Sequence, residues 1–170
     1  MIAFAASSAS GSTMHTGLSI CIPVYNERDA IAETLKRCLA LKPDLERVGV
    51  NELEVIAVDD GSKDGSAEAI AAFPQVRLIR HQVNRGYGAA LKTGFAAASH
   101  ELVGFLDGDA TYPPEQFPNL VREIVEDRAD LVIGSRLAGA ETEMPVIRRI
   151  GNLFFARLLT IIGRAAVSDS

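Results

Sequence analysis

Short apolar runs alternate with segments of helical periodicity from residue 18 onward. The runs are rich in β-branched residues, which favour strands, whereas Ile31, Leu35 and Leu39 recur at close to the helical period. The runs that predict strands are Leu18–Val24, Leu53–Val58, Val76–His81, Leu102–Leu106 and Asp130–Gly134. Alternating strands and helices at this spacing require right-handed crossovers. We therefore predict an α/β fold with a mostly parallel sheet flanked by helices.

The segments between these runs predict the helices. One helix follows Glu27, and the adjacent prolines Pro113 and Pro114 suit the first turn of another. The other predicted helices are Ser66–Phe73, Tyr87–Ser99 and Ile147–Gly163. Neither an internal repeat nor a linker divides the chain, so one domain is expected.

Composition and length indicate where that domain begins and whether it crosses a membrane. The first 17 residues are rich in alanine and serine and lack the basic region of a signal peptide, so residues 1–17 are expected to form a disordered tail. The 170-residue chain is long enough for one buried core, which we assign to residues 18–170. We expect no membrane-spanning segment, since the sequence has no run of ~18 apolar residues.

Charge and cysteine content narrow the possible functions. The chain has 17 Lys and Arg against 22 Asp and Glu, and this net charge of −5 argues against nucleic-acid binding. Cys21 and Cys38 lie in apolar periodic segments, and their spacing suits neither a metal site nor a disulfide framework. Both are therefore expected to be buried reduced thiols, in keeping with a cytoplasmic protein.

Polar residues follow the predicted strands. Ligands of open parallel sheets bind at the carboxyl ends of the strands, so these residues predict a site there. They are Asn26 and Glu27, Asp59 and Asp60, Asn84 and Arg85, Asp107 and Asp109, and Ser135 and Arg136.

Asp107 and Asp109 follow an apolar strand with one glycine between them. Two carboxylates so placed can bind one divalent cation, and oxygen ligands favour Mg²⁺ or Mn²⁺, which bridge diphosphate oxygens. The alternative is a simple Asp-Gly turn.

A phosphatase of the haloacid-dehalogenase type would also use two such aspartates, Asp107 and Asp109, before Thr111. That reaction needs a later lysine, and no lysine follows residue 109.

Two further motifs allow more than one interpretation. The acidic segment from Asp59 to Ser66 fails as a calcium loop because Ala71 stands where a bidentate glutamate is required. It remains either a turn with a helix cap or a carboxylate site for a nucleobase or ribose.

The segment Asn84–Lys92 begins a helix. The N-terminus of this helix could favour an anion, helped by Arg85 and Lys92, or the segment is only a loop and cap.

Taken together, the motifs resemble those of the family 2 glycosyltransferases of GT-A fold, and most of all the dolichyl- or polyprenyl-phosphate sugar synthases. The motifs that carry the resemblance are Pro23–Glu27, Val58–Ser62, Asn84–Gly86, Asp107–Glu115 and Gly134–Arg136. The resemblance implies a GT-A-like, Rossmann-like sheet. It also implies an inverting transfer of a sugar from a nucleotide diphosphate, assisted by Mg²⁺ or Mn²⁺, with GDP-mannose or UDP-glucose as the expected donor.

The resemblance also implies roles for single residues. The base pocket would be lined by Pro23, Tyr25 and Glu27. Asp59 would contact the base or ribose, with Asp60 and Lys92 also in the donor site. The metal and the ribose-diphosphate would lie at Asp107 and Asp109, and Arg136 would lie beside the phosphates.

The acceptor implied by the resemblance is a polyprenyl phosphate. Its oxygen is already anionic, so it needs cations such as Arg136 and Arg148 rather than a base, whereas a sugar hydroxyl of a glycan would need a carboxylate base. The predicted helix Ile147–Gly163 is basic and amphipathic, which suits either the inner face of the cytoplasmic membrane or packing on the sheet.

Similar proteins continue beyond the point where this chain ends, so we expect its domain to be incomplete at the C-terminus. A non-catalytic nucleotide-binding fragment is therefore the alternative to an active enzyme.

Overall fold

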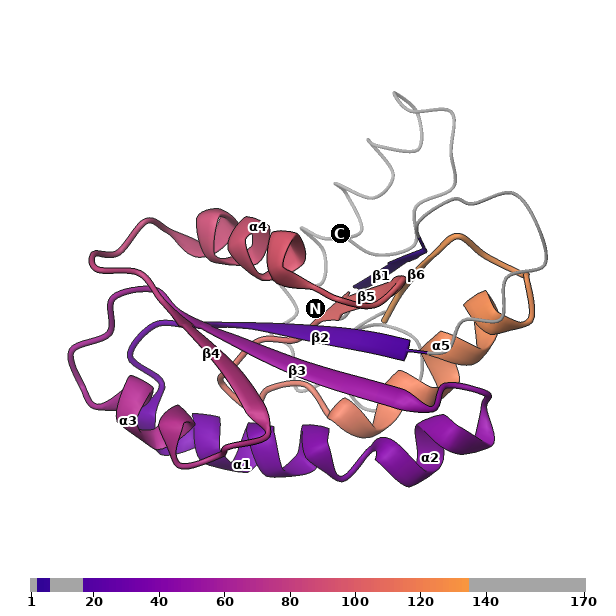
Figure 1. The fold of residues 1–170 in the computed structure, drawn as a ribbon, viewed down its shortest axis with the longest axis horizontal. Helices are drawn as coiled ribbons and strands as arrows, with labels where there is room; N and C mark the ends of the chain where they lie inside the picture. Colours follow the sequence, from indigo (N-terminus) through magenta and orange to yellow (C-terminus); the bar gives the residue numbers. More distant parts are fainter. Residues whose placement is uncertain (1–2, 7–16, 135–170) are drawn as a thin grey trace, which may run out of the picture. The chain divides into compact units, whose positions relative to one another are not determined.

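A computed structural model describes residues 3–6 and 17–134, which build a six-stranded sheet in the order β4-β3-β2-β5-β1-β6 (Figure 1). The strands are β1 (Ala3–Ala6), β2 (Gly17–Val24), β3 (Glu52–Asp59), β4 (Val76–Arg80), β5 (Leu102–Phe105) and β6 (Leu131–Ile133). The helices are α1 (Arg28–Leu39), α2 (Lys42–Arg47), α3 (Ser66–Ala71), α4 (Tyr87–Ala97) and α5 (Phe117–Val125), with a single 3₁₀ turn, η1, at Pro114–Gln116.

The strands β4, β3, β2 and β5 run parallel, as the alternation of strands and helices predicts. All eight residues of β2 are buried, which is typical of a central parallel strand covered on both faces. Its last residue, Val24, is paired with Asp59 at the end of β3. The polar segments that follow these strands therefore meet at one edge of the sheet.

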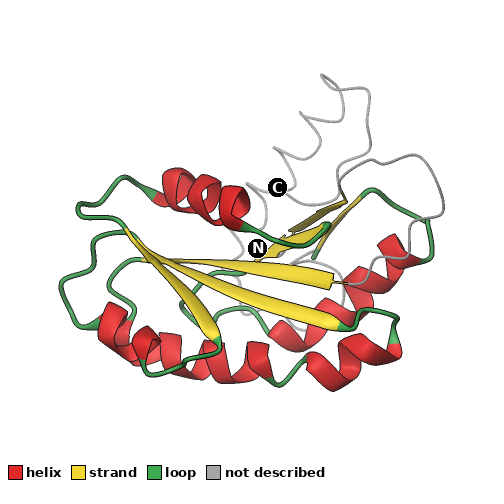
Figure 2. Ribbon diagram, viewed as in Figure 1, coloured by secondary structure: helices red, strands yellow, loops and turns green. Residues whose placement is uncertain are grey.

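Helices cover both faces of the sheet. In Figure 2, α4 lies on one face, and α1, α2, α3 and α5 lie on the other. Alternating side chains of β2 divide the core accordingly: Ile20 and Ile22 belong to the cluster with α1 and α5, and Cys21 to the smaller cluster with Ala90 of α4. Gly94 allows α4 to approach closely, because a Cβ there would lie 3.0 Å from the Cβ of Cys21.

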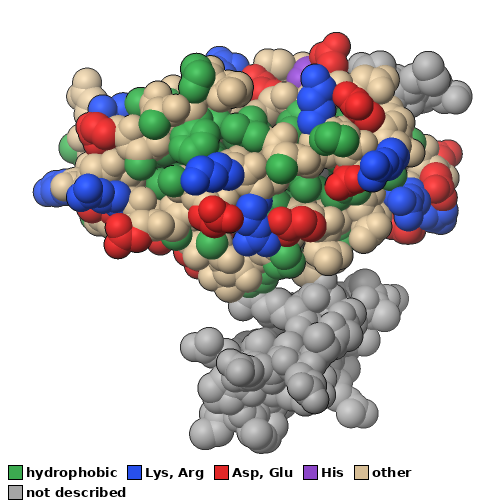
Figure 3. All heavy atoms as spheres, turned by 90° about the horizontal axis from the view of Figure 1, so that it is seen from below, with side chains coloured by type: hydrophobic (Ala, Val, Ile, Leu, Met, Phe, Trp, Pro, Cys, Tyr) green, Lys and Arg blue, Asp and Glu red, His purple; other side chains and the backbone are tan. Residues whose placement is uncertain are grey.

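The two cysteines, Cys21 and Cys38, are free and buried, as expected. The surface on the side of α1 and α2 carries interspersed positive and negative side chains (Figure 3). On the helices of that side, Arg37 pairs with Glu115 and Arg47 with Asp44. Within residues 3–6 and 17–134, no helix is both long and apolar enough to cross a membrane.

The structure differs from the sequence predictions at three places. Residues 3–6, expected within a disordered tail, form β1, which pairs antiparallel with β5 and β6. An unpaired edge of β5 would leave backbone groups without partners, and the uncharged segment Ala3–Ala6 pairs there. The short helix α2 was not predicted, because only Leu45 of its six residues is buried. The adjacent prolines begin η1 rather than α5.

The predicted helix Ile147–Gly163 lies outside the described residues.

Candidate active site

A cavity of about 350 Å³ opens where β2, β3 and β5 end. Its walls come from the loop after β2, the turn after β3, the first turn of α4 and its approach, and the loop after β5. The residues that line it are Pro23, Val24, Tyr25, Glu27, Asp60, Asn84, Tyr87, Ala90, Asp107, Gly108 and Asp109. This is the edge at which the sequence predicts a ligand site.

The lining is acidic. Four carboxylates, those of Glu27, Asp60, Asp107 and Asp109, line the cavity, and none of its lining residues in the described part of the chain is basic. Burial, and then the negative charges of Asp109 and Asp64, raise the pKa of Glu27 above its ordinary value. A cavity with this charge favours a cation and repels a phosphate that arrives alone.

The two aspartates after β5 fit a hard divalent cation. Both Asp107 and Asp109 face the same acidic cavity, and carboxylate oxygens are the ligands that Mg²⁺ and Mn²⁺ prefer. Among the described residues, no group of three Asp, Glu, His or Cys side chains could hold a metal alone. A cation here would take two ligands from the protein and the others from water or a bound substrate, which is usual for Mg²⁺.

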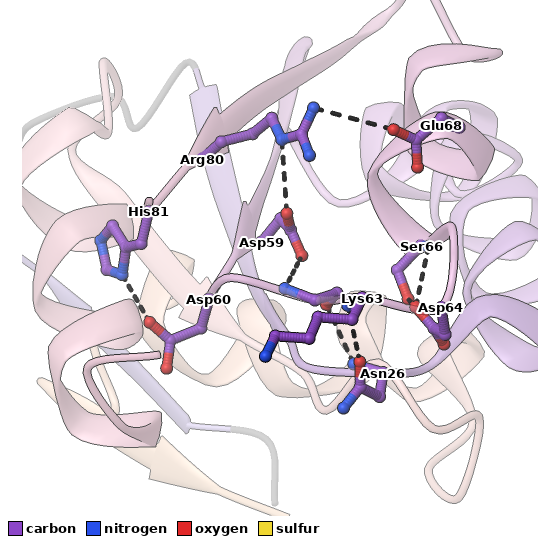
Figure 4. Close-up of polar contacts among 10 residues, drawn as sticks. Asn26, Asp59, Asp60, Lys63, Asp64, Ser66, Glu68, Arg80 and His81 are labelled. Atoms are coloured by element: carbon purple, nitrogen blue, oxygen red, sulfur yellow. Dashed lines mark hydrogen bonds and ion pairs between the residues drawn. The ribbon is translucent and has the colours of Figure 1, made fainter. Parts of the chain in front are cut away.

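The loop that carries Tyr25 and Glu27 is attached to the segment after β3 (Figure 4). Asn26 has a left-handed backbone, with φ of 56°. Its amide donates to Ser62 Oγ at 2.9 Å, and its side-chain Oδ1 accepts from the Lys63 amide at 2.9 Å. The amide of Glu27 donates to Ser66 Oγ, also at 2.9 Å. The polar residues from Ser62 to Ser66 therefore position the loop instead of lining the cavity.

Asp59 and Asp60 have different surroundings. Asp59 is fully buried and does not line the cavity. Its Oδ1 accepts from the Ser62 amide at 3.1 Å, and its Oδ2 lies 3.4 Å from Arg80 Nε (Figure 4). Asp60, one residue later, does line the cavity. Of the two adjacent acids, Asp60 therefore lines the described cavity and Asp59 does not.

Asp60 connects β3 to β4 and to the start of α4. It accepts hydrogen bonds from His81 Nδ1 at 2.6 Å, from the Arg85 amide at 3.0 Å and from the Gly86 amide at 2.8 Å. The other ring nitrogen of His81 lies 2.9 Å from Thr93 Oγ1. Burial opposes ionisation of Asp60, but these three hydrogen bonds lower its pKa below the ordinary value. Asp60 is therefore a charged anchor for the loop before α4.

The loop after β5 is held from both ends. The Asp107 Oδ1 accepts a hydrogen bond from the Tyr87 hydroxyl at 2.6 Å, and Asp109 Oδ1 accepts one from the Thr111 amide at 2.9 Å. Burial and the bond to Asp107 raise the pKa of Tyr87, so its hydroxyl stays protonated. Further along, Arg37 of α1 binds both carboxylate oxygens of Glu115, at 2.8 and 2.6 Å.

Six of the residues predicted for the site lie together around the cavity: Pro23, Tyr25, Glu27, Asp60, Asp107 and Asp109. Asp59 lies behind the wall, and Lys92 is exposed on α4 and does not line the cavity. Arg136 and Arg148 lie outside the described residues.

Tyr87 and His81 were not predicted for the site. A tyrosine in the first helical position after a glycine turn was the available sign of Tyr87, whereas nothing in the sequence distinguishes His81 from an ordinary strand-end residue.

The sequence model of glycosyl transferase family 2 matches residues 19–164. The chain belongs to this family. The match includes the segments after β2, β3 and β5 that line the cavity, and it confirms the family that the motifs indicate.

Two relatives and one solved structure illustrate the similarity. The chain is 36% identical over 154 residues to a dolichyl-phosphate hexose transferase of Haloferax volcanii, covering 90% of this chain and 62% of the relative. It is 39% identical over 120 residues to an undecaprenyl-phosphate 4-deoxy-4-formamido-L-arabinose transferase of Edwardsiella ictaluri, covering 68% and 35%. The chain thus spans less than two thirds of the length of either relative.

The solved structure is a mannosyltransferase of Pyrobaculum calidifontis in complex with GDP-mannose and Mn²⁺. It is similar with a TM-score of 0.53 and 27% identity, over 69% of this chain and 34% of that one. This likeness confirms the predicted GT-A-like arrangement of a mostly parallel sheet flanked by helices.

Proposed function

We propose that the protein is an inverting glycosyltransferase that moves a sugar from a nucleotide diphosphate sugar to a polyprenyl phosphate. The observation that carries the proposal is the acidic cavity in which Asp107 and Asp109 end β5, in a chain of glycosyl transferase family 2. In the transfer, the acceptor oxygen forms a bond to the anomeric carbon as the bond to the diphosphate oxygen breaks. The bonding electron pair leaves with the nucleoside diphosphate.

The donor would enter the cavity with its diphosphate near Asp107 and Asp109, which would hold Mg²⁺ or Mn²⁺. When bound, the cation neutralises charge that develops on the leaving diphosphate. Such a counter-charge is needed because the lining offers four carboxylates and no basic side chain within the described part of the chain. The solved mannosyltransferase, which binds GDP-mannose and Mn²⁺, supports this placement by analogy.

The nucleoside would lie against the loop after β2, where Pro23, Tyr25 and Glu27 line the cavity. Asp60 lines the same cavity and would face the donor, while Asp59 would act on it through the turn that it stabilises. Lys92 is exposed and does not line the cavity, so we assign it no contact with the donor. GDP-mannose and UDP-glucose are the first donors to test.

The acceptor is proposed from the relatives, whose names specify dolichyl phosphate and undecaprenyl phosphate. An acceptor phosphate is already anionic, so no base has to remove a proton from it. It needs cations, and we assign that role to Arg136 and Arg148 because arginine binds phosphate oxygens in pairs. The protein would then work in the cytoplasm, peripherally at the inner face of the membrane.

The test is a transfer assay with the full chain, using radiolabelled GDP-mannose and UDP-glucose and either Mn²⁺ or EDTA. The acceptor is a polyprenyl phosphate (undecaprenyl or dolichyl phosphate in detergent) or, in parallel reactions, an oligosaccharide. Metal-dependent label in the lipid product supports the proposal. Transfer to an oligosaccharide instead would make a glycan hydroxyl the acceptor. Nucleotide binding without transfer to either acceptor would contradict catalysis by this chain and leave a binding fragment.

A further inference from the structure

Tyr87 links the first turn of α4 to the aspartates after β5. Its hydroxyl donates to Asp107 Oδ1 at 2.6 Å, and Tyr87 is one of the residues that line the cavity. The side chain is not forced into this position by burial in the core, since Tyr87 is 52% exposed. Core packing therefore does not account for the hydrogen bond between Tyr87 and Asp107, and we ask what this bond does for Asp107.

The position of Tyr87 is set from the other side of the cavity. The amides of Arg85 and Gly86 donate to Asp60, at 3.0 and 2.8 Å, immediately before α4 begins. Gly86 has φ of 92°, a conformation that turns the chain into the helix and that a side chain would disfavour. Asp60 in turn is held by His81. Tyr87 therefore begins a helix that is anchored to the end of β3 through Asp60, and its hydroxyl reaches the loop after β5.

The two aspartates after β5 are oriented in the same way. Each accepts a hydrogen bond on Oδ1, Asp107 from the Tyr87 hydroxyl and Asp109 from the Thr111 amide at 2.9 Å. Carboxylates that ligate metals are usually oriented by such hydrogen bonds, and loss of the partner typically weakens metal binding about 10- to 100-fold. For Asp109 the partner is backbone, so only Asp107 depends on a side chain that a substitution can remove.

We propose that Tyr87 is a positioning residue that orients the Asp107 carboxylate for the divalent cation. This inference rests on the proposed function, because it assumes that Asp107 is a metal ligand. It differs from two other roles for the same side chain. If Tyr87 served only as a stacking surface for the base, its ring would matter and its hydroxyl would not. If its hydroxyl blocked the site, its removal would strengthen metal binding.

The experiment measures Mn²⁺ affinity by electron paramagnetic resonance, with GDP and separately with UDP present. The four proteins are the wild type, Tyr87→Phe, Asp107→Ala and the double variant. Tyr87→Phe keeps the ring and removes only the hydroxyl, so Mn²⁺ should bind about 10- to 100-fold more weakly. In the Asp107→Ala background the same change should have no further effect, because the acceptor of the Tyr87 hydroxyl is gone. Thermal melting checks that each variant is folded.

Ser99→Ala is the control. It removes a hydroxyl that donates to Glu54, and neither residue lines the cavity, so Mn²⁺ affinity should not change. Equal or tighter Mn²⁺ binding by Tyr87→Phe, or an equal loss in both backgrounds, overturns the role of Tyr87 while leaving the metal site in place. Absence of Mn²⁺ binding by the wild type overturns the proposed metal site itself, and the inference with it.

Discussion

Asp109 is an exposed carboxylate in the loop after β5, and Asp109→Asn keeps its size while removing its charge. The asparagine can still accept from the Thr111 amide through its carbonyl oxygen, so the loop should persist. Loss of an anionic metal ligand should weaken Mn²⁺-dependent binding of GDP or UDP about 100-fold, close to 2.7 kcal/mol. Calorimetric titration measures this directly, and equal affinities of the two proteins would show that Asp109 is not a ligand.

Glu27 gives a prediction about pH. Its pKa is raised by burial, Asp109 and Asp64, so the folded protein favours its protonated form more than the unfolded chain does. Glu27 therefore contributes stability below its unfolded pKa, and this contribution is lost as pH rises through the higher folded pKa. Glu27→Gln should raise the free energy of unfolding at pH 7 by less than about 1 kcal/mol, with no gain at pH 3. Urea unfolding at the two pH values tests it, and a gain of equal size at pH 3 would contradict the electrostatic explanation.

The adjacent acids Asp59 and Asp60 show where prediction from sequence stops at this scale. The position of a carboxylate pair at the end of a strand was predictable, because an apolar run leads directly into it. Which acid lines the cavity was not predictable, since side chains alternate between the faces of a strand and the choice depends on the exact end of pairing. The structure buries Asp59 under Arg80 and opens the cavity to Asp60.

At the scale of elements, the loop after β2 depends on hydrogen bonds from the segment after β3. Ser66→Ala removes the acceptor of the Glu27 amide, which is 2.9 Å from Ser66 Oγ. The substitution also removes the hydrogen bond that the Ser66 hydroxyl donates to Asp64, so the free energy of unfolding should fall by about 1–2 kcal/mol. It should also weaken nucleotide binding several-fold, because Tyr25 and Glu27 lie on the released loop.

Ser99→Ala is a suitable control for that change. Ser99 donates to Glu54 through both its amide and its hydroxyl, and neither residue lines the cavity. The substitution should cause a similar loss of stability in urea unfolding and leave nucleotide affinity unchanged. If both serine variants lose affinity equally, the loss follows general destabilisation and the specific role of Ser66 is rejected.

The elements differ in how well their sequences specify them. The strands β2, β3 and β5 were predictable because they are central and apolar, and helical periodicity located α1. Strand β1 was not, since the short segment Ala3–Ala6 carries no alternation and pairs only because β5 offers an edge. The attachment of the loop after β2 was also hidden, because its hydrogen bonds join residues 36 to 39 positions apart.

At the scale of the whole molecule, the chain brings negative charge to a place where an anionic substrate is proposed to bind. The protein has a net charge of −5, and four carboxylates line the cavity. Those carboxylates come from loops after three different strands, β2, β3 and β5, so their approach is imposed by the sheet. A diphosphate and a divalent cation should therefore bind there together, each reducing the repulsion that opposes the other.

This coupling predicts how ligands change thermal stability. Mn²⁺ with GDP or UDP at 100 times the dissociation constant should stabilise the folded chain by about 2.7 kcal/mol, which corresponds to a rise of roughly 5–10 °C in Tm. Nucleotide with EDTA should give little of this rise, and Asp109→Asn should lose the dependence on Mn²⁺. Thermal melting followed by circular dichroism measures all three conditions on the same protein. A rise of the same size with EDTA present would mean that the nucleotide binds without the cation, and the acidic cavity would then not be its diphosphate site.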